Sequence, residues 1–516
     1  MQLNLGKCLS FLLMLLAGVF AFQRAQESEY IGIDFVQFHL TGQHVISGGD
    51  PHVYSDKVRH EILERAWQVA ISEGTDSKFY HAVNFRHERS WESYSSPFLY
   101  SVFGAAAGDR NDIGAKATPP SSGLRPPSPP IAGEKGRSED YGRAINRYWI
   151  VCLASTMIGF ITFGWVLRIP CSSMLLGAVV LVWFSPLRID LNVANVNQIQ
   201  FGMVGVLAAI LGGTVDRSLR RPELTSVDGI RHAESRRRSD GATVRHFIAG
   251  VWLGLCLAFK PSLLWCGVMW LGPMVLVVGM TRTHRPEHDA SNRRPLVAAV
   301  MGGILGGAIA VEFSAIWFPL YCWIEWIQAV GSLPDDIIQT EQGNYSLTYF
   351  ARTYGAPGGL AKLAGPLVGV GLVFVVGRRL LKSWSATTLE TRSTEIASCL
   401  AIGCLIHLLT SNLVWYHYGL LSLPAMIVVL RRVVSSDSWN DAMSLGGILI
   451  WCLLLIGLQP IDEMLASPPS EHFLRCVIGN LILLILLLIL PDRLPIFSND
   501  QQVVACRNWN WRRRRP

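Results

Sequence analysis

Charged residues are scarce in this chain of 516 residues. They make up 16% of the sequence, against roughly 25% in typical soluble proteins, while hydrophobic residues make up 50%. The hydrophobic residues collect in runs, several of which approach the ~20 residues that cross a ~30 Å hydrocarbon core: Leu9–Phe22, Ile145–Val166, Pro295–Phe318 and Phe473–Leu490. This balance excludes an ordinary soluble protein and predicts an all-α polytopic membrane protein.

The sequence also lacks the motifs of soluble nucleotide and metal chemistry. It contains no Walker sequence, GxGxxG or HExxH, no GxSxG in a supporting context, and no CxxC pair among its eleven cysteines. Most cysteines lie inside apolar runs, and none lies between Gln23 and Tyr148. We therefore expect apolar fillers rather than disulfides, and neither a metal nor a cofactor.

The basic excess is small and is placed between apolar runs. Lys and Arg number 45 against 38 Asp and Glu, giving a net charge of +7. Arginines crowd a few connecting segments, as the positive-inside rule predicts for cytoplasmic loops: Arg217–Arg245, Arg282–Arg294, Arg378–Lys382, Arg431–Arg432 and Arg512–Arg515. The charge therefore indicates orientation in the plasma membrane, with both termini cytoplasmic, and not nucleic-acid binding.

Hydropathy divides the chain into four regions and about twelve spans. We expect a first transmembrane helix in 1–22, although a cleaved signal peptide fits it too, an extracytoplasmic loop over 23–144, a membrane domain over 145–490 and a basic tail over 491–516. Within the loop, the Pro-, Gly- and Ser-rich stretch 109–140 predicts a disordered insertion. The spans are expected near 8–22, 145–167, 171–185, 197–213, 246–259, 262–280, 296–318, 362–376, 395–413, 417–430, 444–460 and 472–490.

Polar residues kept beside apolar runs are the candidates for function, because charges in a bilayer are costly. Asp34 follows the first predicted span, where it suits a general base toward a lipid-borne substrate, but it is equally typical of a helix N-cap. Tyr94 lies in a cluster of aromatic, serine and proline residues. That cluster either shapes a substrate groove or anchors the chain at the membrane interface.

Amide, lysine and histidine side chains mark two further outer segments. Asn197 and Gln198 suit sugar hydroxyls, and they also suit hydrogen bonds between helices. Lys260 suits a phosphate or extends toward lipid headgroups. Tyr416 and His417 lie in an aromatic belt, where the histidine either donates to a phosphate or serves as an anchor.

These segments follow one another in a recognisable order: Asp34-Phe35 with Phe38, Gly48–Tyr54, Ser93–Pro97, Asn195–Gln198, Gly250–Pro261, Gly343–Leu347, and Trp415–Tyr418 running into Leu423-Pro424. In that order they resemble the family 87 glycosyltransferases. These are membrane enzymes of the C-type (GT-C) fold that take a sugar, typically mannose, from a polyprenyl phosphate. The resemblance spans roughly residues 31–430. It rests on several short elements that occur in the same order and on one predicted face of the membrane.

The resemblance implies a GT-C architecture, a polyprenyl-phosphate sugar donor and a lipid or glycan acceptor of the cell envelope. Asp34 would be the catalytic base that deprotonates the acceptor hydroxyl, and His417 would act beside the donor phosphate. The substrate-binding residues would be Lys260, Asn197, Gln198, Tyr94, Asn344 and Tyr416. A single base opposite the leaving phosphate predicts an inverting hexosyltransferase.

The sequence departs from the family pattern at several positions. Asn197-Gln198 ends an element in which the family often shows Gly-Gln-Val-Asn, Tyr345 replaces a frequent Gln, and Ser95 stands where a second proline is common. The 109–140 insertion has no counterpart. These departures leave the identities of the sugar and the acceptor open.

A transporter or flippase of a lipid-linked saccharide is the alternative function. It would need a similar number of spans and a polar cavity, but more typically carries several intramembrane charges and helices broken in repeat-related positions. Glu312 is the one obvious acid well inside a predicted span. The sequence therefore favours the enzyme.

Overall fold

The regular secondary structure of the described chain is helical. The computed structural model describes residues 19, 23, 32–89, 94–107, 137–212, 228–284, 286–331, 344, 346–353, 355, 357–384, 389–411, 413–436, 438–457 and 469–489. Across these ranges the β-structure is limited to isolated bridge positions, namely the pair Asn344 and Trp415 and Phe184. The predicted all-α class is therefore confirmed for the described residues.

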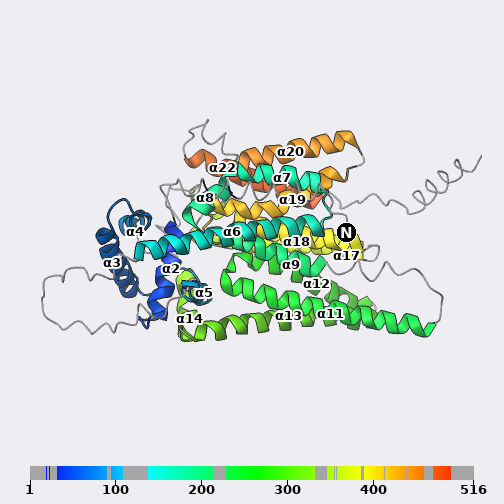
Figure 1. Ribbon diagram of the computed structural model, residues 1–516. Coiled ribbons are helices and arrows are strands. Elements are labelled where there is room, and N and C mark those ends of the chain that lie inside the picture. The colour runs from blue at the N-terminus through cyan, green and yellow to red at the C-terminus, as the bar shows by residue number, and fades with distance from the viewer. Residues whose placement is uncertain are drawn as a thin grey trace, which may run out of the picture.

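Two groups of helices build the molecule. An end layer contains α2 (Ile33–Ile46), α3 (Asp56–Glu73), α4 (Lys78–Arg89) and α5 (Pro97–Ala107). The long helices run side by side as a bundle, and the end layer covers one of its ends (Figure 1). The bundle helices are α6 (Arg137–Val166), α7 (Cys171–Val182), α8 (Ser185–Val193), α9 (Asn197–Gly212), α11 (Asp228–Phe259), α12 (Leu264–His284), α13 (Pro286–Ala315), α17 (Gly358–Trp384), α18 (Leu389–Thr410), α19 (Leu423–Val434), α20 (Trp439–Gly457) and α22 (Pro469–Ile489).

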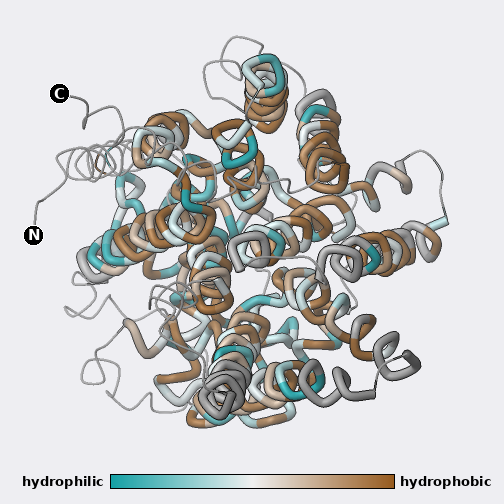
Figure 2. The backbone as a smooth tube through the Cα atoms, turned by 90° about the vertical axis from the view of Figure 1, so that its right-hand side faces the viewer, coloured by the Kyte–Doolittle hydropathy of each residue, from teal (hydrophilic) through white to brown (hydrophobic). Residues whose placement is uncertain are grey.

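Short elements connect the bundle helices at their ends. They are α14 (Tyr321–Gly331), α16 (Leu347–Thr353) and the 3₁₀ helices η2 (Pro261–Leu263) and η3 (Tyr416–Ser422). Seen from a second side, the tube is mainly hydrophobic along most bundle helices (Figure 2). That composition suits a bundle surrounded by lipid.

Six helices in the described ranges are long and apolar enough to cross a membrane, which supports a membrane-embedded protein. They are Tyr141–Val166, Gly241–Phe259, Arg293–Ala315, Ser393–Thr410, Tyr416–Val434 and Trp439–Gly457. The bent pair α8 and α9 raises the number to seven. The predicted spans 171–185, 262–280, 362–376 and 472–490 are largely helical where they are described, over α7, α12, α17 and α22, but their apolar stretches are shorter.

Several predicted boundaries fall outside the described residues. These include the first span 8–22 apart from Val19, the stretch 109–136 and the tail 491–516. Helix α6 begins at Arg137 rather than at 145, so the end of the predicted insertion is already helical. The polar first turns of α6 carry no hydropathy signal, which explains the late boundary.

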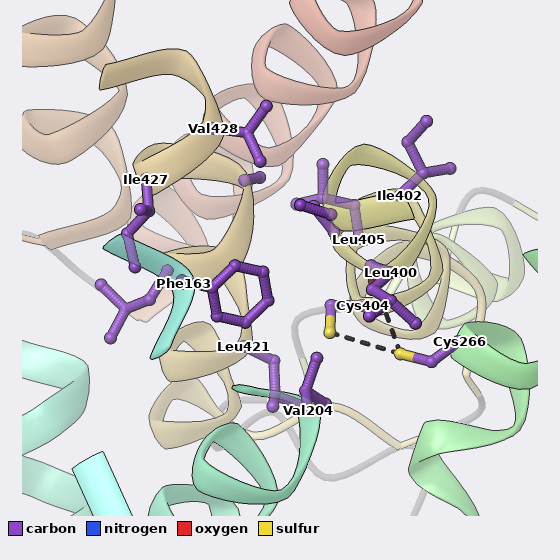
Figure 3. Packing of buried hydrophobic residues seen from close by; sticks show 14 of the residues in the cluster. Phe163, Val204, Cys266, Leu400, Ile402, Cys404, Leu405, Leu421, Ile427 and Val428 are labelled. Atoms are coloured by element: carbon purple, nitrogen blue, oxygen red, sulfur yellow. Dashed lines mark hydrogen bonds between the residues drawn. The ribbon is translucent and has the colours of Figure 1, made fainter. Parts of the chain in front are cut away.

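Most bundle helices contribute to the bundle core, among them α6, α9, α12, α18 and α19. Phe163, Val204, Leu400 and Leu405 are almost completely buried there, as Figure 3 shows. The Sγ atoms of Cys266 and Cys404 lie 3.5 Å apart in the same core. Of the nine cysteines in the described ranges, all are free and eight are buried, so they fill apolar space as expected.

The direction of the helices separates the basic segments from the end layer. Helix α11 runs from Arg245 toward Lys260, and α19 runs from η3 toward Arg431 and Arg432. Lys260 follows the last residue of α11, and His417 lies in η3, just before α19. Both residues are therefore at the end of the bundle opposite to these arginines. The end layer lies on the side away from the arginine-rich connections.

Helices α11 and α13 pack with their backbones in close contact through glycines. A Cβ atom at Gly306 would lie 2.1 Å from the carbonyl oxygen of Val251, and one at Gly250 would lie 2.1 Å from that of Ala299. Small residues let membrane helices approach in this way. Gly307, the next residue after Gly306, has open space around its missing Cβ.

We expect Gly306→Ala to destabilise the protein and Gly307→Ala not to. The first methyl group collides with the backbone of α11 and should cost about 1–3 kcal/mol by overpacking, whereas the second meets nothing and gains helix propensity. Thermal unfolding of the purified variants in one detergent measures the difference. Equal melting temperatures for the two variants would contradict this packing.

Candidate functional site

Helix α2 presents Asp34 in its first turn. The helix is entered through Gly32, whose φ of 74° is left-handed and whose Cβ would lie 2.4 Å from Ile145 Cδ1. Gly32 N donates to the carbonyl of Asn192 at 2.7 Å, so α2 is tied to the bundle at the point where it starts. The N-cap of α2 is therefore Gly32, and the N-cap interpretation of Asp34 is wrong.

A sharp turn between α8 and α9 brings amide side chains to the same place. The two helices are bent by 118°, and Ala194 in the turn has a left-handed φ of 54°, a costly conformation for a residue other than glycine. Two aromatic residues of α6 hold the turn: Trp149 Nε1 donates to Leu191 O at 2.9 Å, and Tyr148 Oη donates to Asn195 O at 2.6 Å. The turn is therefore held in place by the bundle.

Both carboxylate oxygens of Asp34 are bonded from different helices. Arg86 Nη2 in α4 donates to Oδ1 at 2.5 Å, and Asn195 Nδ2 donates to Oδ2 at 2.6 Å. Arg86 Nε also donates to the carbonyl of Ile33 at 3.1 Å. Charge-assisted bonds of this kind are among the strongest in proteins, so the carboxylate is fixed between the end layer and the bundle.

Lys260 continues the network where α11 ends. Its Nζ donates to Asn195 Oδ1 at 3.2 Å and to Asn197 Oδ1 at 3.3 Å, and Asn197 Nδ2 donates to Asp190 Oδ1 at 2.8 Å. The ammonium also lies 4.4 Å from the centre of the Tyr418 ring, a cation–π distance. Lys260 therefore points inward, and the interpretation as a headgroup-directed side chain is wrong.

Burial changes the acidity of this lysine. It lowers the pKa of Lys260 to about 8, although the Asp190 and Asp34 carboxylates oppose the shift. An ammonium has three N–H donors, and the two amide bonds use two of them. The remaining donor capacity suits an anion in the site.

His417 faces the same carboxylate from η3. Its Nε2 lies 4.0 Å from Asp34 Oδ2, beyond hydrogen-bond distance, and this buried nitrogen makes no hydrogen bond to the described residues. Asn344 fixes the preceding segment by accepting from Val414 N at 3.0 Å and bridging to Trp415. A buried polar atom without a partner suits a group supplied by a ligand.

The predicted residues divide into two sets. The structure brings Asp34, Lys260, Asn197 and His417 together. Gln198 is fully buried and accepts from Thr156 Oγ1 of α6 at 2.9 Å. This is the hydrogen bond between helices that the alternative interpretation of Gln198 predicts.

The remaining candidates have positional roles in the described contacts. The Tyr94 carbonyl accepts from Trp326 Nε1 at 3.0 Å, which ties it to α14 rather than to the Asp34 carboxylate. Asn344 supports the segment before η3, and the half-buried Tyr416 begins η3 next to His417. They therefore shape the surroundings of the site.

Sequence reasoning missed Arg86 and the central place of Asn195. Arg86 belongs to the polar helix sequence Phe85-Arg86-His87-Glu88-Arg89, in which nothing marks one arginine as buried. Asn195 was visible only as one amide in a dense cluster. Its reach to both Asp34 and Lys260 depends on the bend after Ala194.

No family model matches the chain, and no curated protein or solved structure is significantly similar to it. Across the described ranges, no three His, Cys, Asp or Glu side chains are grouped so as to hold a metal ion. The site is therefore defined by its geometry: a fixed carboxylate, a lysine with donor capacity and a histidine nitrogen facing them.

We expect Arg86→Leu to destabilise the protein by about 3 kcal/mol, because removing one partner of a buried ion pair leaves the other charge unpaired. The double variant Arg86→Leu with Asp34→Leu should recover part of this loss, since it removes both charges. Thermal unfolding of wild type, both single variants and the double variant gives the coupling free energy. Additive losses would show that the pair contributes no coupling.

Proposed function

We propose that this protein is an integral membrane glycosyltransferase of the GT-C type, resembling family 87. It moves a sugar, with mannose as the first candidate, from a polyprenyl phosphate to a hydroxyl of a lipid or glycan acceptor on the extracytoplasmic face. The observation that carries the proposal is the meeting of Asp34, Lys260 and His417 at one end of the bundle. These three residues lie far apart in the sequence and come from separate elements.

Asp34 fits the part of the general base. Its Oδ2 accepts from Asn195 and faces His417 Nε2 at 4.0 Å, so an acceptor hydroxyl that reaches Oδ2 meets an ionised oxygen held in place. The hydroxyl oxygen attacks the anomeric carbon, the bond from that carbon to the phosphate oxygen breaks, and the hydroxyl proton passes to Asp34. Polyprenyl phosphate leaves, and attack opposite it inverts the anomeric centre.

Lys260 and His417 fit the donor phosphate. A phosphodiester carries one negative charge, and the Lys260 ammonium retains donor capacity beyond its two amide bonds. The unbonded His417 Nε2 supplies a second donor in the tautomer that carries the proton there. Fixed donors of this kind stabilise the charge that develops on the leaving phosphate.

The transporter alternative receives less support from the arrangement. Glu312, the acid expected inside a span, is exposed near the end of the span Arg293–Ala315. Asp34, Arg86, Asp190 and Lys260 gather at one end of the bundle instead of being spread along its length. A transfer site needs that concentration, whereas a path across the membrane needs groups at several depths.

We expect Asp34→Asn to lower sugar transfer about 10²- to 10⁴-fold, because the amide cannot accept the hydroxyl proton. The assay supplies radiolabelled polyprenyl-phosphate mannose and a mixed pool of lipid and glycan acceptors to the purified protein in detergent. Asp56→Asn is the matched control, since this carboxylate on α3 is almost fully exposed. A folded Asp34→Asn protein with full activity would refute Asp34 as the base.

Inactivity of the wild type itself would have a different meaning. It would remove support for the mannosyl donor, and donors with other sugars would be compared next. Movement of a lipid-linked saccharide across proteoliposomes containing the wild type, without any transfer, would favour the flippase.

We expect kcat/KM for the donor to fall as the pH rises through about 8. Lys260 is protonated below its pKa of about 8 and loses its charge above it, so the phosphate loses a cation at alkaline pH. Lys260→Arg keeps the charge throughout this range and should abolish the fall, whereas Lys260→Met should show weak donor use at every pH. A wild type and a Lys260→Arg variant with the same alkaline limb would contradict this role.

A further inference from the structure

Helix α14 has one buried and one exposed apolar face. Cys322 and Trp326 point into the core of the end layer, while Leu320, just before the helix, Ile324 and Ile327 are 65%, 59% and 63% exposed. The spacing of three residues places Ile324 and Ile327 on one side of the helix, where Gln328 is exposed beside them. Leu320, Ile324 and Ile327 form an apolar stripe on the exposed side.

The helix is too short to cross a membrane. Its 11 residues extend about 16 Å at a rise of ~1.5 Å per residue, about half of a ~30 Å hydrocarbon core. It follows Pro319 after the end of α13 and packs beside α5 at the end-layer side of the bundle (Figure 1). This position puts α14 where the spans end.

Exposed apolar residues also lead from α13 to α14. Ile309 and Phe313 on α13 are 45% and 36% exposed, and Ile316, in the segment that joins α13 to α14, is 63% exposed. Glu325, the acid of α14, is turned away to His52, with 2.6 Å between its Oε1 and Nδ1 of the histidine. Exposed apolar residues therefore lead from a candidate span to α14, and the exposed acid among them, Glu312, lies near the end of that span.

Aromatic residues flank the stripe. Tyr321 is 40% exposed and stacks on His52, with 4.6 Å between ring centres, and Trp323 Nε1 donates to Ser314 Oγ at 3.0 Å. Tyr and Trp at such positions are typical of the membrane–water boundary. A short helix with an apolar stripe between polar and aromatic edges has the composition of an interfacial helix.

We propose that α14 lies in the membrane interface at the end of the bundle that carries Asp34, with Leu320, Ile324 and Ile327 among the lipid acyl chains. The occupant of the stripe is the lipid leaflet and not a protein, because α14 follows directly on a candidate membrane span and exposed apolar residues lead from that span to the stripe. The buried face of α14 holds Tyr94 through Trp326 and His52 through Glu325. The helix thereby fixes the depth of the end layer relative to the membrane surface, whatever reaction the site performs.

The test replaces single residues by a fluorescent amino acid in the full-length protein, reconstituted in lipid nanodiscs. Positions Ile324 and Ile327 probe the stripe, Ile304 on α13 probes a span, and Ile71 on α3, 52% exposed, is the matched isoleucine outside the stripe. Quenching is measured with phospholipids brominated near the headgroup, with phospholipids brominated near the chain end, and with aqueous iodide. Circular dichroism and thermal unfolding select the folded variants.

Probes at 324 and 327 should lose about half of their emission to the lipid brominated near the headgroup, as shallow burial of ~5–10 Å requires. They should lose less to the lipid brominated near the chain end. The probe at 304 should show the reverse preference, and the probe at 71 should respond to iodide alone. Quenching of 324 and 327 by iodide as strong as that of 71 would overturn the proposal, and so would protection from both lipid and iodide, which would indicate a protein cover.

Discussion

The Asp34 carboxylate is the group around which the end of the bundle is organised. A carboxylate removed from water is costly unless it is paired and hydrogen-bonded, and here each oxygen receives its bond from a different element, Arg86 of α4 and Asn195 of the α8–α9 turn. Because one donor belongs to the end layer and the other to the bundle, satisfying the charge also fixes the end layer on the bundle. The left-handed backbone conformations at Gly32 and Ala194 lie at the start of α2 and in the α8–α9 turn, where Asp34 and Asn195 meet.

The polar network alternates in charge and is linked by amides. Asn195 and Asn197 bond in the same way: the Nδ2 of each donates to a carboxylate, Asp34 or Asp190, and the Oδ1 of each accepts from Lys260 Nζ. This pattern fixes the orientation of both amides, because an amide turned by 180° would place its oxygen against a carboxylate. The lysine is thereby held between two acids without touching either, which leaves its charge accessible to an anion.

Local sequence signals predicted long apolar helices and several residues of the site. Runs such as 246–259 mark a span whatever their neighbours are, and Asp34, Lys260 and His417 are conspicuous because each stands beside such a run. Arg86 is not, because its burial depends on how α4 packs on α2, and α4 is a polar helix with several charges. Hydropathy could not predict the number of spans either. The helical segments near 171–185 and 362–376 have apolar stretches too short to show whether they cross the membrane.

The position of the network bears on what the site can do. It joins α2, α4, α9 and the end of α11 by direct bonds, so a movement that parts α4 from α2 would break the Arg86–Asp34 pair. Separating a buried ion pair costs several kcal/mol, and a transporter would meet that cost in every cycle. A group-transfer reaction keeps the pair intact and needs only that a hydroxyl and a phosphate arrive from one side. Under the proposed function, the chain of a lipid-borne substrate stays in the bilayer while its head reaches the end of the bundle, and the Arg86–Asp34 pair persists through the reaction. The network therefore fits the proposed transfer better than movement through the bundle.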